Sequence, residues 1–281
     1  MGLPMARRLL EAGCSLAGFD ASEVARARFR EAGGSLCDSL AAAADQAEVL
    51  ITMLPNGDIV REVLLGEGAA AQALVPGALV IDMSSSEPQG TRLLEGELAA
   101  LGLGLIDAPV SGGVKKAVDG SLAIMVGGPG EQLERARPLL SAMGSKIFHA
   151  GPIGAGHAMK ALNNYVSAAG LAALCEALVI AGRFGIEEET VVDILNASTG
   201  RNNSTENKAK PYLLPRAFDS GFALALMAKD IGIAGELARS LDLPSPLLER
   251  SLALWSEASG VLGPGADHTE YLRFVEGKRE E

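Results

Sequence analysis

The stretch Val49-Leu-Ile-Thr-Met-Leu54 is too uniformly apolar for a strand that has one face in water. Similar short apolar runs occur at residues 79–81, 103–106, 123–126 and 146–148, and segments with helical patterns separate them. This alternation of short apolar runs and helical segments is typical of parallel strands that helices cover on both faces. The pattern therefore predicts an α/β fold with a mostly parallel sheet.

The pattern of apolar residues changes after Gly151-Pro-Ile-Gly-Ala-Gly156, where the strand-like runs stop. A long apolar helix is expected over residues 157–184. Amphipathic helical stretches then follow at residues 187–197, 204–214, 222–240 and 246–260. We therefore expect a sheet domain over residues 1–152 and an all-helical domain over residues 153–281, joined by the long helix.

The most apolar long window, residues 166–182, contains Glu176 and is short for a membrane span. A buried helix is expected there, and no membrane association. No charged segment followed by an apolar one opens the chain, so no signal peptide is recognised.

The composition argues against nucleic-acid binding, a disulfide framework and a metal site. The chain of 281 residues carries 35 Asp and Glu against 24 Lys and Arg, a net charge of −11. Nucleic-acid binding is not expected, because it needs a basic surface. Cys14, Cys37 and Cys175 are widely spaced, and with three histidines they give neither a disulfide framework nor a metal site. A reducing compartment, the cytoplasm, is expected.

The N-terminus contains part of a recognisable unit. Met1-Gly-Leu-Pro-Met-Ala6 leads directly into a helical pattern, and Asp20 ends the next apolar run. In a dinucleotide-binding Rossmann unit, a strand and a G-x-G-x-x-G turn precede such a helix, and an acid about 20 residues further on binds the ribose. Gly2 stands where the third glycine would be, and the first strand is absent. An ordinary chain start with a loop acid is the alternative.

Five segments, in order, resemble the β-hydroxyacid dehydrogenases, the family of 3-hydroxyisobutyrate dehydrogenase and tartronate semialdehyde reductase. They are Met1-Gly-Leu-Pro-Met-Ala6, Met53-Leu-Pro55, Asp107-Ala-Pro-Val-Ser-Gly-Gly113, Gly156-His-Ala-Met-Lys-Ala-Leu-Asn-Asn164 and Leu226-Met-Ala-Lys-Asp230. The resemblance implies oxidation of a short 3-hydroxy acid to its semialdehyde with NAD, or the reverse reduction. It also implies that residues 1–152 bind the dinucleotide and that the helical domain serves substrate binding and oligomerisation.

Members of this family begin earlier, with a central strand and a Gly-x-Gly turn. Removing that strand leaves two neighbouring strands with unpaired edges. We therefore expect that the sequence starts at an internal Met of a longer enzyme. The rival expectation is a naturally short protein that binds its cofactor poorly, and an in-frame stop codon just before Met1 would favour it.

Lys160 is the candidate catalytic acid or base, because a hydroxy acid loses its hydroxyl proton as hydride leaves the carbon. A free lysine titrates near 10.4. The positive end of the long helix and partial burial are both expected to lower the pKa of Lys160. Asn164 lies four residues later on the same helical face, and the resemblance implies that it contacts substrate.

Ser111, Gly112 and Gly113 follow a strand that ends at Asp107. Ligands bind beyond the carboxyl ends of parallel strands, and two glycines let backbone N–H groups approach an anion. A substrate carboxylate is expected at this turn, for which a plain tight turn is the alternative.

The remaining candidates concern the cofactor. Asp20 would accept hydrogen bonds from ribose hydroxyls and repel a 2′-phosphate, so NAD is favoured over NADP. No arginine follows Asp20 before Arg26. The resemblance further implies cofactor contacts for a group that consists of Gly2, Leu54, Pro55, Ser85 and Lys229.

Two departures from the family's sequence pattern leave the identity of the substrate open. Residues 200–205, Gly-Arg-Asn-Asn-Ser-Thr, lack the Trp that 3-hydroxyisobutyrate dehydrogenases have in this region, which favours a more polar substrate. Lys115 and Lys116 stand beside the substrate turn and either bind a second anionic group or are simply solvated. A semialdehyde reductase of the tartronate or succinate type is therefore the alternative.

Two other functions are alternatives to a hydroxy-acid dehydrogenase. An imine reductase on the same fold is opposed by Lys160, which such enzymes replace. A non-catalytic dinucleotide-binding protein is favoured by the missing glycine turn and opposed by Lys160 and Asn164. The apolar helical domain also predicts a homodimer or homotetramer.

Overall fold

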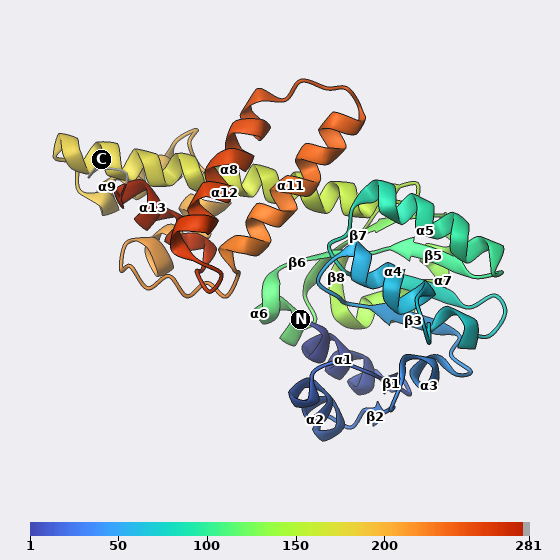
Figure 1. The fold of residues 1–281 in the computed structure, drawn as a ribbon. Helices are drawn as coiled ribbons and strands as arrows, with labels where there is room; N and C mark the ends of the chain where they lie inside the picture. The colour runs from blue at the N-terminus through green and yellow to red at the C-terminus, as the bar shows by residue number, and fades with distance from the viewer. Residues whose placement is uncertain (278–281) are drawn as a thin grey trace. The chain divides into compact units, whose positions relative to one another are not determined.

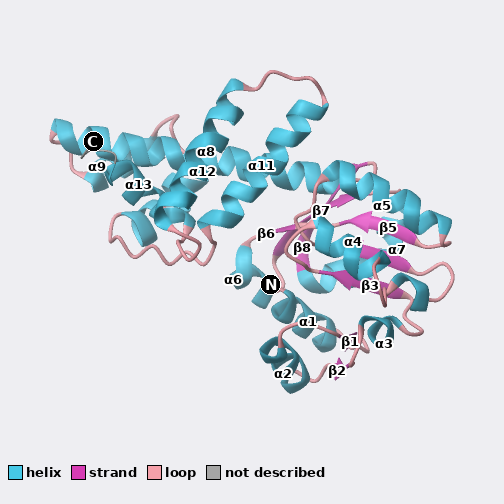
Figure 2. Cartoon of the chain, viewed as in Figure 1, coloured by secondary structure: helices cyan, strands magenta, loops and turns pink. Residues whose placement is uncertain are grey.

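The computed structural model describes residues 1–277, and the chain divides into two compact units, Met1–Lys160 and Ala161–Glu281 (Figure 1). The first unit contains the sheet and the second is helical (Figure 2). This confirms the predicted fold class of a mostly parallel sheet followed by a helical part.

The main sheet of the first unit has six strands in the order β3-β4-β5-β7-β6, and β8 also pairs with β7. Its strands are β3 (Val49–Thr52), β4 (Leu79–Asp82), β5 (Gly104–Asp107), β6 (Val110–Ser111), β7 (Leu122–Gly127) and β8 (Gly144–Gly151). Neighbours β3, β4 and β5 are parallel, as are β7 and β8, whereas β7 runs antiparallel to β5 and β6.

Two further strands, β1 (Ala17–Gly18) and β2 (Ser35–Leu36), form a separate parallel pair. In the part of the chain that the structure describes, β3 is the outer strand of the main sheet on its side. The pair of β1 and β2 is therefore not part of the main sheet.

Helices cover the main sheet because its central strands are apolar on both faces. In β4, Leu79 and Ile81 belong to one hydrophobic core and Val80 to another, since successive side chains of a strand point to opposite faces. The helices of the first unit are α1 (Gly2–Glu11), α2 (Glu23–Glu31), α3 (Leu40–Ala44), α4 (Gly57–Leu65), α5 (Pro88–Ala100), α6 (Gly113–Val118) and α7 (Gly130–Met143), with a 3₁₀ turn, η1, at Ala71–Ala73.

The second unit packs its helices around a core that includes Trp255 stacked on Tyr271, with ring centroids 4.5 Å apart. The helix α8 (Ala155–Phe184) starts in the first unit and continues into the second. The further elements are α9 (Glu188–Ala197), α10 (Asn203–Asn207), the π-helical turn η2 (Ala209–Leu213), α11 (Leu224–Ser240), α12 (Pro246–Leu262), the 3₁₀ turn η3 (His268–Glu270) and α13 (Tyr271–Gly277).

The continuous helix predicted over residues 204–214 is wrong, because the segment consists of α10 and the separate turn η2. Pro211 lies in this turn and has no N–H to continue an α-helical ladder. The backbone N–H of Leu213 instead donates to the carbonyl of Lys208, five residues back. The helical turns after residue 267 were not predicted.

The prediction of a buried helix at residues 166–182 holds for one face of α8 only. Leu171, Leu174 and Leu178 are buried in the core, whereas Val166 and Ile180 are exposed. By length and composition α8 could cross a membrane, and 28% of its most apolar window is buried.

Asp267 holds the loop before α11 to η3. Its carboxylate accepts hydrogen bonds from the hydroxyl of Ser220 and from the backbone N–H groups of Gly221 and Phe222. It also accepts one from the backbone N–H of Thr269, so Asp267 is the N-cap of η3. Burial alone would raise the pKa of Asp267, but contacts with His268, Thr269 and Ser220 outweigh it and hold this pKa below its usual range.

Candidate active site

Two buried carboxylates mark the carboxyl edge of the sheet. The neighbouring strands β4 and β5 end at Asp82 and Asp107, which lie opposite each other in the parallel register. Both side chains are almost completely buried. A buried carboxylate is costly unless hydrogen bonds compensate, so the partners of each one show what it organises.

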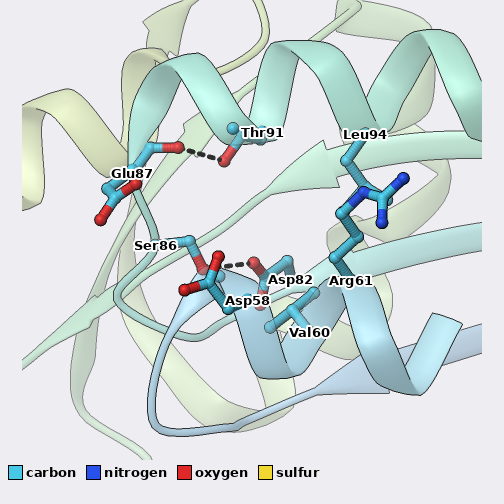
Figure 3. Close-up of a pocket in the computed structure, with 10 residues that line it drawn as sticks. Asp58, Val60, Arg61, Asp82, Ser86, Glu87, Thr91 and Leu94 are labelled. Atoms are coloured by element: carbon cyan, nitrogen blue, oxygen red, sulfur yellow. Dashed lines mark hydrogen bonds between the residues drawn. The ribbon is translucent and has the colours of Figure 1, made fainter. Parts of the chain in front are cut away.

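Asp82 organises the loops that follow β3 and β4. Its carboxylate accepts hydrogen bonds from Thr52 Oγ1 at 2.8 Å, from the backbone N–H of Ser84 at 3.0 Å and from Ser86 Oγ at 2.9 Å. Figure 3 shows the Ser86 contact beside the first turns of α4 and α5. Asp82 therefore ties the end of β3 to the loop after β4.

The loop after β3 holds two of the predicted cofactor residues. The backbone N–H of Leu54 donates to Ser84 Oγ at 2.9 Å, and Asn56 caps α4 by accepting from the N–H of Ile59. Pro55 between them is exposed, and Ser85 on the neighbouring loop is half-buried. The structure thus brings Leu54, Pro55 and Ser85 onto two loops fixed by hydrogen bonds at the carboxyl edge.

A cavity of about 50 Å³ lies between α4 and α5 and is lined by Asp82, Ser86 and Thr91, among others (Figure 3). None of the predicted site residues lines it. It has room for water-sized molecules only, so it is not a dinucleotide pocket.

Asp107 organises the beginning of α8. Its Oδ1 accepts a hydrogen bond from the backbone N–H of Gly154, and its Oδ2 accepts one from that of His157, both at 2.7 Å. Lys160 is half-buried and follows one turn later. The carboxylate of Asp107 thus lies at the positive end of the α8 dipole, the end that the sequence argument places near Lys160.

Asn164, Lys229 and Asp230 come together in the second unit. The buried Asn164 donates from Nδ2 to Asp230 Oδ2 at 2.5 Å, and Asn163 donates to Asn164 Oδ1 at 3.1 Å. Lys229 Nζ lies 3.7 Å from Asp230 Oδ1. Asp230 therefore orients the amide of Asn164 and neutralises part of the lysine charge.

The turn after β6 begins with the half-buried Ser111 and continues with two exposed glycines. Gly112 has φ +132° and Gly113 has φ +68°, a conformation that residues with a Cβ rarely adopt. A Cβ on Gly112 would lie 2.5 Å from Cδ of Lys116. Lys116 thus packs across this turn, a placement that sequence reasoning did not predict.

Asp20 is exposed at the end of the β1 segment and accepts a hydrogen bond at Oδ1 from the N–H of Ser22. Arg26 folds back from α2 so that its Nη1 donates to the backbone carbonyl of Asp20 at 2.9 Å. Its guanidinium also lies 5.7 Å from the centre of the Phe19 ring. Arg26 was dismissed by its distance in sequence, although Ser22 as a helix cap signals a helix start that turns Arg26 toward Asp20.

Gly2 is the first residue of α1 and is exposed. A Cβ added to it would approach only Met53, at an ordinary 3.9 Å. Packing within the described residues therefore does not require glycine at this position.

Comparison with known proteins agrees with this arrangement of motifs. Residues 1–151 match the model for the NAD binding domain of 6-phosphogluconate dehydrogenase. Residues 154–275 match the model for the NAD-binding domain of NADP-dependent 3-hydroxyisobutyrate dehydrogenase. The chain belongs to the β-hydroxyacid dehydrogenase family. It is an oxidoreductase of hydroxy acids that uses a nicotinamide dinucleotide, as the sequence predicts.

Three relatives illustrate the range of the family. The chain is 35% identical to 2-(hydroxymethyl)glutarate dehydrogenase of Eubacterium barkeri, over 95% of this chain and 88% of the relative. It is 37% identical to 3-sulfolactaldehyde reductase of Escherichia coli, over 92% and 87%. A solved 3-hydroxyisobutyrate dehydrogenase of Mycobacterium tuberculosis with L-serine superposes with a TM-score of 0.92 at 32% identity, over 98% and 95%.

Proposed function

We propose that the protein oxidises a short 3-hydroxy acid to its semialdehyde with NAD, or runs the reverse reduction, and that Lys160 exchanges the proton with the substrate hydroxyl. The observation that carries the proposal is the fixed start of α8, where a buried carboxylate anchors the turn before Lys160. A dinucleotide, when bound, accepts the hydride at C4 of its nicotinamide. The hydroxyl proton then needs an acceptor, which the amine of Lys160 provides.

Asn164 is the proposed second catalytic residue, lying four residues beyond Lys160 on α8. Its amide uses one N–H on Asp230 and one lone pair of Oδ1 on Asn163. An amide has two N–H donors and two carbonyl lone pairs, so one of each stays available for a substrate oxygen. Because Asn164 is uncharged, it does not stabilise the ammonium form of the lysine.

The turn of Ser111, Gly112 and Gly113 is the proposed site for the substrate carboxylate. Successive backbone N–H groups at positive φ form a concave nest that suits an anion, and Ser111 adds a hydroxyl donor. Lys116 packs over this turn and Lys115 is exposed beside it, so both favour a substrate with a second anionic group. The relative named for 2-(hydroxymethyl)glutarate, a dicarboxylate, has such a substrate, which supports this choice over 3-hydroxyisobutyrate.

The dinucleotide is proposed to contact Gly2, Leu54, Pro55, Ser85 and Lys229, with Asp20 on the ribose hydroxyls. Exposed Asp20 at the end of a parallel strand fits a ribose, and the fixed loops at the carboxyl edge fit the rest of the cofactor. These features favour NAD. Arg26 beside Asp20 favours NADP as the second candidate, since a guanidinium can pair with a 2′-phosphate.

The test of the proposed function is a panel of three- to five-carbon hydroxy acids and semialdehydes, followed by the absorbance of reduced nicotinamide with NAD and NADP in parallel. Turnover of a hydroxy acid with a second acidic group, lost in Lys160→Ala, is the expected result. No turnover of any member, together with tight dinucleotide binding, would instead establish a non-catalytic binding protein.

We further infer a homodimer or homotetramer that works in the cytoplasm, where free thiols such as Cys14 and Cys37 persist. Val166 and Phe184 on α8 are 67% and 85% exposed, and such apolar surface favours burial against another copy. Light scattering on Val166→Glu tests this, with the exposed Val24→Glu of the first unit as control. A mass equal to one chain for the unchanged protein would contradict the assembly.

The division of labour between residues 1–152 and 153–281 stays part of this proposal. The first segment is assigned to the dinucleotide and also provides the substrate turn of Ser111, Gly112 and Gly113. The second segment is assigned to substrate and assembly and also provides Lys229 for the cofactor.

A further inference from the structure

We propose that Asp107 is a positioning residue for Lys160 and sets its reactivity without contacting substrate. The inference rests on the proposed catalytic role of Lys160. The first N–H groups of a helix have no partner within the helix, so whatever accepts from them fixes where the helix begins. In α8 that acceptor is one carboxylate, which binds both Gly154 and His157 at 2.7 Å.

The contact leaves no room for adjustment, because glycines on both sides bring backbone against the carboxylate. A Cβ on Gly127, at the end of β7, would lie 2.4 Å from Asp107 Oδ1 and 2.8 Å from the backbone nitrogens of Ala155 and Gly156. A Cβ on Gly156 would lie 2.3 Å from the carbonyl oxygen of Met125. The start of α8 is therefore held by direct backbone packing.

The ring of His157 provides a second point of attachment. It is buried, and its Nδ1 lies 2.8 Å from Thr91 Oγ1 on α5. The same hydroxyl donates to the carbonyl of Glu87 in the first turn of α5 (Figure 3). His157 Nε2 faces Asp82 Oδ2 at 3.6 Å. The turn that precedes Lys160 is thus attached to β5 by its backbone and to α5 by its side chain.

An amide cannot replace the carboxylate in this arrangement. Asn at position 107 offers one oxygen acceptor, and its NH₂ group would face the second backbone N–H. One buried donor is then left without a partner, and the first turn of α8 must shift to relieve it. A displacement of about 1 Å at a reacting group can lower a rate about 100-fold, so the expected effect is on the chemical step.

The experiment compares Asp107→Asn and Lys160→Ala, singly and combined, by single-turnover rate and by fluorescence titration of reduced dinucleotide. Asp107→Asn is expected to lower the rate constant about 10- to 100-fold and to leave dinucleotide affinity within about twofold. Combined with Lys160→Ala it should lower the residual rate by less than about threefold, because residues that act as a unit are not additive. Asp45→Asn, an exposed carboxylate of the same unit, is the control.

If Asp107→Asn does not fold, Thr91→Val replaces it, since it removes the hydroxyl that contacts His157 and the carbonyl of Glu87 and keeps the shape. The same non-additive pattern with a rate loss of about 3- to 10-fold is then expected. An unchanged rate in the variant that folds, or a full additive loss in the double variant, overturns the inference and leaves the proposed function standing. Wild-type turnover by Lys160→Ala overturns both.

Discussion

Asp107 and Asp230 are both buried carboxylates that serve a residue of α8, but they are held in different ways. Asp107 accepts from two backbone N–H groups, which move only if the fold moves. Asp230 accepts from the side-chain amide of Asn164, and its Oδ1 accepts no hydrogen bond within residues 1–277 although Lys229 Nζ is 3.7 Å away. Asp107 therefore gives Lys160 a rigid support, whereas Asp230 gives Asn164 a support that can adjust.

The largest effect is expected at Lys160. Lys160→Ala removes the proposed proton acceptor, and the loss of general acid or base catalysis lowers kcat about 10²- to 10⁴-fold. Dinucleotide affinity, measured by fluorescence, should stay close to that of the unchanged protein. Equal kcat would show that the carboxylate at the start of α8 supports packing and not chemistry.

A smaller effect is expected at Asn164, whose support by Asp230 can adjust. Asn164→Ala removes the substrate contact and leaves Asp230 without its amide donor, which should lower kcat/KM about 10- to 100-fold. Asn163→Ala is the matched control, because within residues 1–277 the side-chain hydrogen bond of its amide goes to Asn164, and it should cost less than about tenfold. If Asn163→Ala lowers kcat/KM as much as Asn164→Ala does, Asn164 is held as rigidly as Lys160. That result would contradict the contrast between Asp107 and Asp230.

The sequence identified the strands and the motifs because both are local. The apolar runs around Val49 and Leu79 predicted β3 and β4 correctly, since strands covered on both faces contain little else. The distant partners of the two strand-end acids could not be predicted, because Thr52 is 30 residues from Asp82 and His157 is 50 residues from Asp107 in sequence. The break at Lys208, between α10 and η2, could not be predicted, because the residues around Pro211 have a helical pattern on both sides of it.

Asp20 differs from Asp107 and Asp230, because it is an exposed carboxylate that holds no helix of the core. Asp20→Asn should shift the ratio of kcat/KM for NAD over NADP toward NADP about tenfold, since it removes one charged ribose contact. Arg26→Ala should shift the ratio in the opposite direction. A protein that already prefers NADP more than tenfold would contradict the assignment of NAD.

The smallest effect on activity is expected at Asp267, a carboxylate held by hydroxyls and backbone together. Its pKa is lowered on folding, so the ionised form stabilises the fold above the unfolded value near 3.8 and this contribution is lost as the pH falls further. Asp267→Asn should lower the free energy of unfolding by about 1 kcal/mol at pH 7. Urea titrations at pH 7 and pH 3 should show that this difference in unfolding free energy is smaller at pH 3, and kcat at pH 7 should equal that of the unchanged protein.

Lys116 and Gly112 have a practical consequence for engineering this enzyme. The aliphatic stem of Lys116 occupies the volume that a side chain at position 112 would need. A library that varies substrate range at position 116 must keep Gly112 constant, because φ of +132° at this position is a conformation that residues with a Cβ rarely adopt. Short replacements for Lys116 would exchange a charge for an opening next to the turn, so selectivity and rigidity would change in the same step.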